Sequence, residues 1–134
     1  MVCLHCGAKT HVTNSRLQKR SNQVWRRRQC LNCNAIFTAL EAVDYGSSWL
    51  VQSASGHLEP FLRDKLWLSL YKAVEHRPAA VKEAGALCDT IIKKLSPLAE
   101  EGRLGAVSIA QVAQVALNRF DQAASVYYQA RHTA

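Results

Sequence analysis

The chain has 134 residues, of which 49% are hydrophobic, which is enough for one domain or two very small ones. No apolar run approaches the length of a membrane span, and the N-terminus lacks the apolar segment of a secretion signal, so we expect a cytoplasmic protein. The net charge of +7 is unevenly distributed, because residues 1–44 hold seven Lys or Arg against two acidic residues. Such concentrated positive charge favours a polyanion as partner, most often nucleic acid.

Four of the five cysteines form two Cys-x-x-Cys pairs near the N-terminus. Cys3 and Cys6 form the first pair, and Cys30 and Cys33 form the second. Together they provide four thiolates for one tetrahedral Zn²⁺, and a segment of this size buries too little apolar surface to fold without metal. We therefore predict a zinc-ribbon domain at residues 1–45. The fifth cysteine, Cys88, lies on the apolar face of a predicted helix, which indicates a core thiol.

Between and after the two pairs, the sequence predicts short β-strands. Residues 12–16 and 24–28 have the composition of strands and are separated by a polar turn. Residues 35–38 are a third candidate strand. The first domain is therefore expected to be a small β structure that depends on its metal.

The arginines of this domain are its candidate DNA contacts. Because side chains alternate along a strand, Arg26 and Arg28 share one face and Arg27 lies on the other. We expect Arg26 and Arg28, together with Arg16, to contact phosphates or guanine, whose edge arginine recognises through two hydrogen bonds. Arg27 completes the predicted DNA-binding set.

A second domain is expected at residues 49–134, after a small, polar boundary at 45–48. Residues 49–52 and 57–58 are expected to pair as a short hairpin. From Pro60 onward the apolar residues recur at helical spacing, which predicts about four helices. The fold class that follows is α+β.

Three local signals place the ends of these helices. A helix is expected from about Ala79 to Leu95, where the apolar face includes Val81. The pattern from Ser108 to Gln111 is a capping box and predicts the start of the next helix. Asp121 is expected to cap the last one.

The order of zinc ribbon, hairpin and helices resembles the NrdR-type transcriptional repressors of ribonucleotide reductase genes. The likeness covers nearly the whole chain and is most specific at Cys3-x-x-Cys6-Gly7, residues 12–16, 26–33, 37–41, 56–65 and 76–78. It implies a bacterial, nucleoid-associated protein whose ribbon binds promoter repeats in double-stranded DNA. It also implies an ATP-cone whose bound ATP or dATP sets the size of a homo-oligomer and thereby the affinity for DNA.

Within that cone, the resemblance implies that Glu59, Lys65 and Arg77 bind the nucleotide. The family places a Lys-Arg pair on the phosphates, and this chain has Ser53 and Ala54 at those positions. Charge-assisted hydrogen bonds contribute roughly 1.5–3 kcal/mol each, so the two missing cations represent several kcal/mol. The chain is therefore expected to be a divergent member of this group.

Two functions are compatible with these patterns. The first is a zinc-dependent DNA-binding repressor with nucleotide-modulated oligomerisation. The second is a zinc-ribbon module that binds RNA or protein, with a cone that only oligomerises. An enzyme is not expected, because a site of four cysteines leaves no open coordination position, and the sequence suggests no Ser/His/Asp set and no carboxylate pair.

Overall fold

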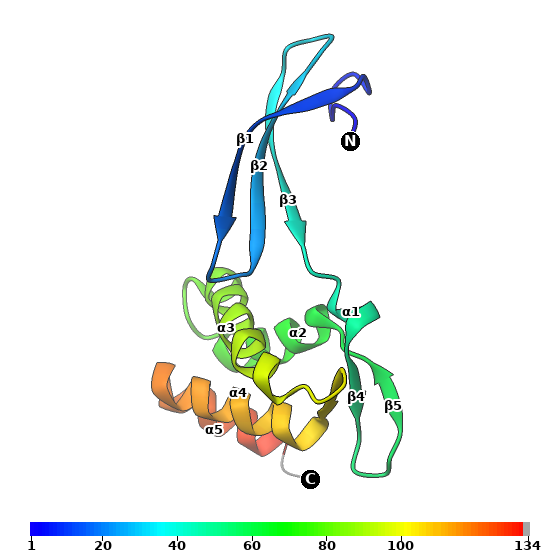
Figure 1. The fold of residues 1–134 in the computed structure, drawn as a ribbon. Coiled ribbons are helices and arrows are strands. Elements are labelled where there is room, and N and C mark those ends of the chain that lie inside the picture. Colours follow the sequence, from blue (N-terminus) through cyan, green and yellow to red (C-terminus); the bar gives the residue numbers. More distant parts are fainter. Residues whose placement is uncertain (133–134) are drawn as a thin grey trace. The chain divides into compact units, whose positions relative to one another are not determined.

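The computed structural model describes residues 1–132 of the chain (Figure 1). The chain divides into two compact units, the first of residues 1–43 and the second beginning at Asp44. Within the described residues, no helix is long and apolar enough to cross a membrane. The α+β class expected from the sequence is confirmed, with strands in both units and helices in the second.

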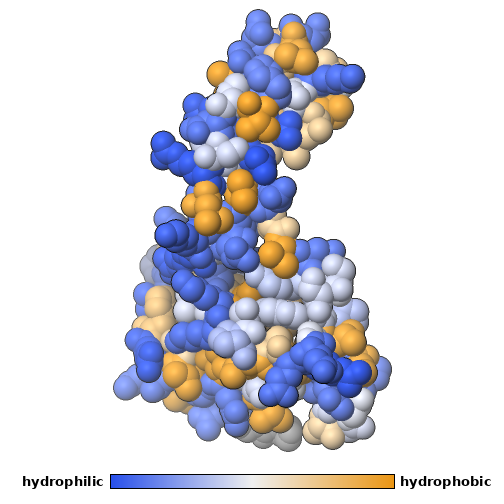
Figure 2. Space-filling model, viewed as in Figure 1, coloured by the Kyte–Doolittle hydropathy of each residue, from blue (hydrophilic) through white to orange (hydrophobic). Residues whose placement is uncertain are grey.

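The first unit is a three-stranded antiparallel sheet in the order β1-β2-β3. Its strands are β1 (Thr10–Gln18), β2 (Gln23–Cys30) and β3 (Ile36–Ala42), each longer than expected. The unit has almost no apolar core, because its buried hydrophobic residues are only Cys3, Cys30 and Ala39. In the view of Figure 2, hydrophilic residues cover most of its visible surface, with apolar residues scattered among them.

The second unit begins with a short helix and a small mixed sheet. Helix α1 (Tyr45–Ser48) occupies the small, polar stretch that was expected to form the domain boundary. Strands β4 (Leu50–Gln52) and β5 (Leu58–Pro60) form the predicted hairpin, so Pro60 lies in a strand and not in the first turn of a helix. A third strand, β6 (Arg103–Gly105), pairs in parallel with β4 and was not predicted.

Four longer helices complete this unit: α2 (Arg63–Val74), α3 (Ala80–Leu95), α4 (Ala106–Phe120) and α5 (Gln122–His132), with a 3-10 turn, η1 (Ser96–Leu98), after α3. They pack around one apolar core, whose largest fully buried side chains include Leu70, Ile91, Leu95, Leu104 and Leu117. Cys88 is fully buried among them, and burial raises the pKa of its thiol to about 11, which confirms a structural role.

The helix starts agree only in part with the local signals. Helix α3 begins one residue after Ala79, as expected, but Val81 is exposed. The capping box at Ser108 is wrong, because α4 already begins at Ala106 and its N-cap residue, Gly105, has no side chain to cap it. The cap at Asp121 is confirmed, since its carboxylate accepts a hydrogen bond from a backbone N–H in the first turn of α5.

Candidate metal centre and nucleic-acid interface

Four sulfur atoms come together at the end of the sheet that is nearest the N-terminus. The Sγ atoms of Cys3, Cys6, Cys30 and Cys33 all lie within 4.8 Å of one another, with Cys3 and Cys33 3.7 Å apart and Cys6 and Cys30 3.5 Å apart. A tetrahedron with Zn–S bonds of about 2.3 Å has edges of about 3.8 Å. All four cysteines are free of disulfides. The donor set and its spacing therefore fit Zn²⁺.

Both Cys-x-x-Cys pairs adopt the same local turn. The backbone N–H of His5 donates to the Cys3 sulfur at 3.3 Å, and the N–H of Asn32 donates to the Cys30 sulfur at 3.3 Å. The residues that follow the pairs, Gly7 and Asn34, have φ values of 75° and 60°. Glycine and asparagine tolerate this left-handed conformation best, so the sequence is suited to the turn.

Backbone amides and neighbouring thiols shift the pKa values of Cys6 and Cys33 in opposite directions. The backbone N–H of Ala8 is the main reason that the pKa of Cys6 is lowered to about 6. At Cys33 the N–H of Ala35 also favours the thiolate, but burial and the neighbouring thiols outweigh it and raise the pKa to about 11. Four negative sulfurs repel one another without a cation between them. A divalent ion removes that repulsion, so the residues fit a metal that takes four thiolates.

The metal centre and the sheet form one structure. Cys30 is the last residue of β2, and its N–H donates to the carbonyl of Ala35 at 2.9 Å. The N–H of Leu31 donates to the carbonyl of Lys9 at 3.1 Å, one residue before β1. The cluster therefore fixes the ends of all three strands, and with them the arginines of β2.

The register of the sheet assigns each arginine to a face. Arg26 and Arg28 lie on one face of β2 and Arg27 on the other, as the alternation predicts. Arg16 pairs directly with Trp25, so it shares the face of Arg27. Arg16 therefore lies on the opposite face of the sheet from Arg26 and Arg28, and the contact of these arginines with DNA stays a prediction. The structure brings together two pairs of arginines on opposite faces.

Arg26 and Arg28 contact neighbouring strands. A nitrogen of Arg26 donates to the hydroxyl of Ser15 at 3.0 Å, and another lies 3.6 Å from a carboxylate oxygen of Glu41. A nitrogen of Arg28 donates to the hydroxyl of Thr10 at 3.1 Å. The Nε atom of Arg28 is buried and has no hydrogen-bond partner in the described residues.

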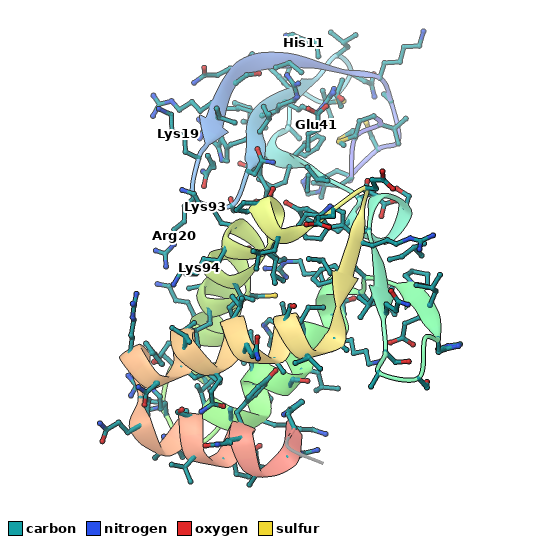
Figure 3. All side chains as sticks on the ribbon, turned by 60° about the horizontal axis from the view of Figure 1, so that its bottom comes forward. His11, Lys19, Arg20, Glu41, Lys93 and Lys94 are labelled. Carbon is teal, nitrogen blue, oxygen red and sulfur yellow. The ribbon has the colours of Figure 1, made fainter. Side chains whose placement is uncertain are left out.

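Arg16 and Arg27 are exposed, and neither side chain is engaged by an acidic residue in the described part of the chain. The guanidinium of Arg27 lies 5.6 Å from the centre of the Trp25 ring. Trp25 is only partly buried, and its ring lies against this exposed cation. Lys19 and Arg20, labelled in Figure 3, lie in the exposed turn between β1 and β2 and add two further cations.

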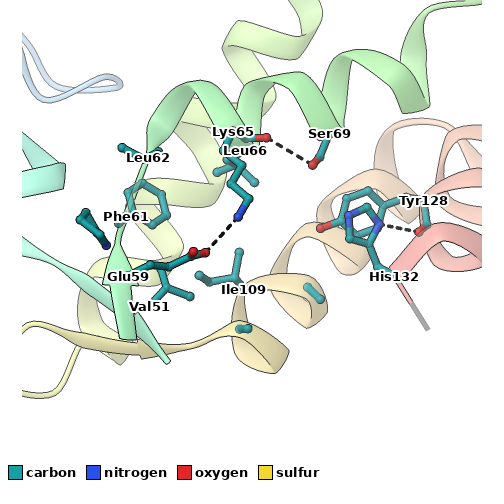
Figure 4. Close-up of a pocket in the computed structure, with 13 residues that line it drawn as sticks. Val51, Glu59, Phe61, Leu62, Lys65, Leu66, Ser69, Ile109, Tyr128 and His132 are labelled. Atoms are coloured by element: carbon teal, nitrogen blue, oxygen red, sulfur yellow. Dashed lines mark hydrogen bonds and ion pairs between the residues drawn. The ribbon is translucent and has the colours of Figure 1, made fainter. Parts of the chain in front are cut away.

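In the second unit, Glu59 and Lys65 line one pocket of about 190 Å³ (Figure 4). The ammonium of Lys65 lies 2.9 Å from a carboxylate oxygen of Glu59, and this hydrogen bond lowers the pKa of Glu59. The pocket's walls include Phe61, the residue after β5, and Tyr128 and His132 from α5. Sequence reasoning missed these last two, because nothing local in α5 marks them as neighbours of β5.

Arg77 does not belong to this pocket. Its guanidinium contacts the carboxylates of Glu83 at 2.6 Å and Asp121 at 3.1 Å. His76 also contacts Asp121, at 2.9 Å. These contacts lower the pKa of Asp121 to about 2, with the hydrogen bond to His76 as the largest cause. The cluster joins the end of α2 to the start of α5, so the structure separates Arg77 from the other two nucleotide-binding candidates.

Comparisons with known proteins agree with this arrangement. Residues 1–41 match the family model described as "Transcriptional repressor NrdR-like, N-terminal domain". Over 96% of its length the chain is 33% identical to a transcriptional repressor NrdR from Heliobacterium modesticaldum, of which the match covers 88%. It is 32% identical to a repressor of the same name from a Psychrobacter species, with 96% and 83% covered. A third, from Symbiobacterium thermophilum, is 38% identical over 71% of this chain and 63% of its own length.

Proposed function

Because the chain belongs to the NrdR family of transcriptional repressors, we propose that it is a zinc-dependent repressor whose first unit binds double-stranded DNA. The observation that carries this proposal is the cluster of four sulfurs, which supports a sheet bearing four arginines. The charge of +5 on residues 1–44 falls to +3 when four thiolates hold one Zn²⁺. The unit stays basic, as a DNA-binding surface requires.

The residues of the proposed site fall into two groups. The metal ligands are Cys3, Cys6, Cys30 and Cys33. The candidates for DNA contact are Arg16, Arg26, Arg27 and Arg28, two on each face of the sheet, and the contacts come from one of these two pairs. Phosphate contacts give position and salt dependence, and contacts to base edges give sequence preference.

We propose that the protein acts as a homo-oligomer on repeated sequences near promoters. One sheet of this size offers a small interface, so a single unit gains little affinity. Linking several units on neighbouring repeats raises the affinity without any new contact, because the second binding event becomes intramolecular. The proposed place of action is the cytoplasm, in association with the nucleoid.

The second unit is proposed as the assembly domain and, by its likeness to an ATP-cone, as the site of any ATP or dATP effect. The pocket beside Glu59 and Lys65 supports this, since it combines apolar walls with one anion and one cation. Its volume of 190 Å³ is smaller than the range of roughly 300–1,000 Å³ for small-molecule sites, so only part of a nucleotide fits inside. Arg77 is engaged elsewhere, which leaves Lys65 as the candidate for phosphate.

Titration calorimetry with ATP and dATP tests this second part. If Lys65 contacts phosphate, binding occurs in the wild type and is weaker in Lys65→Gln. A matched control is Lys72→Gln, which removes the same charge from the same helix outside the pocket. If the metallated protein gives no heat of binding at millimolar nucleotide, the second unit does not bind nucleotide and its proposed role is limited to assembly.

The DNA-binding function is tested with the metallated full chain and duplex promoter fragments at about 50 and 200 mM salt, where phosphate contacts produce a steep loss of affinity. We expect the protein to bind duplex DNA, and we expect single-stranded RNA of equal length to be a poor competitor for the bound protein. A protein that binds duplex DNA no better than its metal-stripped form would contradict the proposal. Preferential displacement by RNA would favour the RNA-binding alternative.

A further inference from the structure

The two faces of the three-stranded sheet differ in how their arginines are used. We propose that duplex DNA binds to the face that carries Arg16, Trp25 and Arg27, called here the Arg27 face. The opposite face, with Arg26 and Arg28, is the Arg26 face, and its arginines hold the sheet together. This inference rests on the proposed function, since it identifies which surface of the same unit meets DNA.

The assignment to faces follows from the strand pairing. Residues opposite each other in an antiparallel pair point to the same side of the sheet. Arg16 is opposite Trp25, and Asn14 is opposite Arg27. Arg16 and Arg27 are thus diagonal neighbours on β1 and β2, a relation that brings Cα atoms to roughly 7–8 Å. Two long side chains at this separation reach adjacent groups on one DNA strand.

On the Arg26 face the positive charge is already partly used. Arg26 is hydrogen-bonded to Ser15 and lies 3.6 Å from the carboxylate of Glu41. Glu41 belongs to the adjacent strand β3, two residues after the residue that pairs with Arg26. Only 32% of the Arg26 side chain is exposed. Arg28 donates to Thr10, whose own hydroxyl donates to the carbonyl of Met1, so Arg28 is tied to the segment that contains the first metal ligand. Binding a phosphate there requires breaking these contacts.

On the Arg27 face the charge is available. Arg16 and Arg27 are both exposed, and none of the residues that the pairing assigns to this face is acidic. The guanidinium of Arg27 lies over the ring of Trp25, 5.6 Å from its centre, so an aromatic face holds this exposed cation without neutralising it. Asn14 and Thr38, opposite Arg27 on the two flanking strands, add an amide and a hydroxyl that can donate to phosphate oxygens or base edges.

The geometry also suits a groove of DNA. The major groove admits a two-stranded β-ribbon, and β1 and β2 form such a ribbon. Its turn carries Lys19 and Arg20, which are exposed. A ribbon that enters with the Arg27 face toward the bases would place these two cations beyond Arg16, where the backbone of the duplex passes.

A pair of neighbouring substitutions tests the inference. Arg27→Gln and Arg26→Gln remove the same charge from adjacent residues of one strand, so the long-range attraction falls equally and only the face differs. Binding is measured with the metallated full chain and with the duplexes that the wild type enriches from a random pool. Zinc content and thermal unfolding of each variant show that the metal centre is intact.

We expect Arg27→Gln and Arg16→Gln each to weaken binding by at least tenfold and to reduce the slope of log affinity against log salt by about 0.9, the value for one phosphate contact. We expect Arg26→Gln to change affinity by less than about threefold. Equal losses in Arg26→Gln and Arg27→Gln, or a larger loss in Arg26→Gln, would overturn the inference and leave the proposed function intact. A metallated wild type that enriches no duplex would remove both.

Discussion

Replacement of one metal ligand is expected to unfold the first unit and leave the second folded. In Cys30→Ser a thiolate that is 1% exposed is lost from the cluster of four sulfurs. Apart from two of its cysteines, the unit buries only one hydrophobic residue, Ala39. A buried methyl or methylene group contributes about 0.8 kcal/mol, whereas a structural Zn²⁺ contributes roughly 10–16 kcal/mol in isolated modules. Apolar burial therefore cannot replace the metal.

Amide hydrogen exchange is the assay, because it reports each strand separately. In Cys30→Ser the amides of β1, β2 and β3 should exchange at nearly unfolded rates, whereas those of α3 and α4 should keep their wild-type protection. Leu31→Ser is the matched control, since Leu31 is the adjacent residue, is 64% exposed and is not a ligand. If Cys30→Ser contains no metal and still protects the strands like the wild type, the reasoning about what holds this sheet is refuted.

Three further comparisons test the second unit, each by denaturant unfolding. Leu117→Ala should lower the free energy of unfolding by about 2–5 kcal/mol, because Leu117 is fully buried, whereas Val115→Ala, half exposed on the same helix, should change it by less than about 1 kcal/mol. Gly102→Ala should destabilise more than Gly56→Ala, because both residues have positive φ but only a Cβ at Gly102 would meet a backbone oxygen, at 2.8 Å; equal losses would contradict the steric argument. Asp121 has a pKa of about 2 in the folded chain against an ordinary 3.8, so its contribution is present above about pH 4 and lost as the pH falls toward 2. Asp121→Asn should therefore be less stable than the wild type at pH 7, with a difference that shrinks as the pH falls from 4 through 2, and a constant difference across this range would count against the linkage.

The parts of the structure that depend on local sequence were predictable. The metal centre follows from two Cys-x-x-Cys pairs, whose spacing alone fixes four donors. The alternation of Arg26, Arg27 and Arg28 within one strand was also correct, because it needs no knowledge of a partner strand. The burial of Cys88 follows from helical periodicity in the same way.

The parts that depend on distant pairing were not predictable. The face of Arg16 is set by the register between β1 and β2, and that register shifts between Val12 and Asn14. A shift of one residue moves a side chain to the other face, and no residue of β1 gives a local signal for that shift. Strand β6 was missed for a related reason, since the three residues from Arg103 to Gly105 become a strand only because β4 lies beside them.

The capping box at Ser108 predicted the wrong helix start, because the end of strand β6 places the start of α4 before it. With Ser108 as cap the helix would begin at residue 109, but it begins at Ala106, directly after β6 ends at Gly105, so the connection between strand and helix determines the first turn. A hydroxyl at Ser108 then lies inside the helix and cannot cap it. A local motif therefore predicts a helix start only when no tertiary constraint places the start elsewhere.

The parallel pairing of β4 with β6 has a consequence for the order of folding on the ribosome. Strand β4, residues 50–52, lacks its neighbouring strand β6 until residues 103–105 have been synthesised. Helices α2 and α3 and the turn η1 are made before that point. The first unit pairs only segments adjacent along the chain, so it can take up its metal while the remainder is still being translated. We therefore expect arrested nascent chains of increasing length to gain zinc well before they resist protease in the segment from β4 to α3.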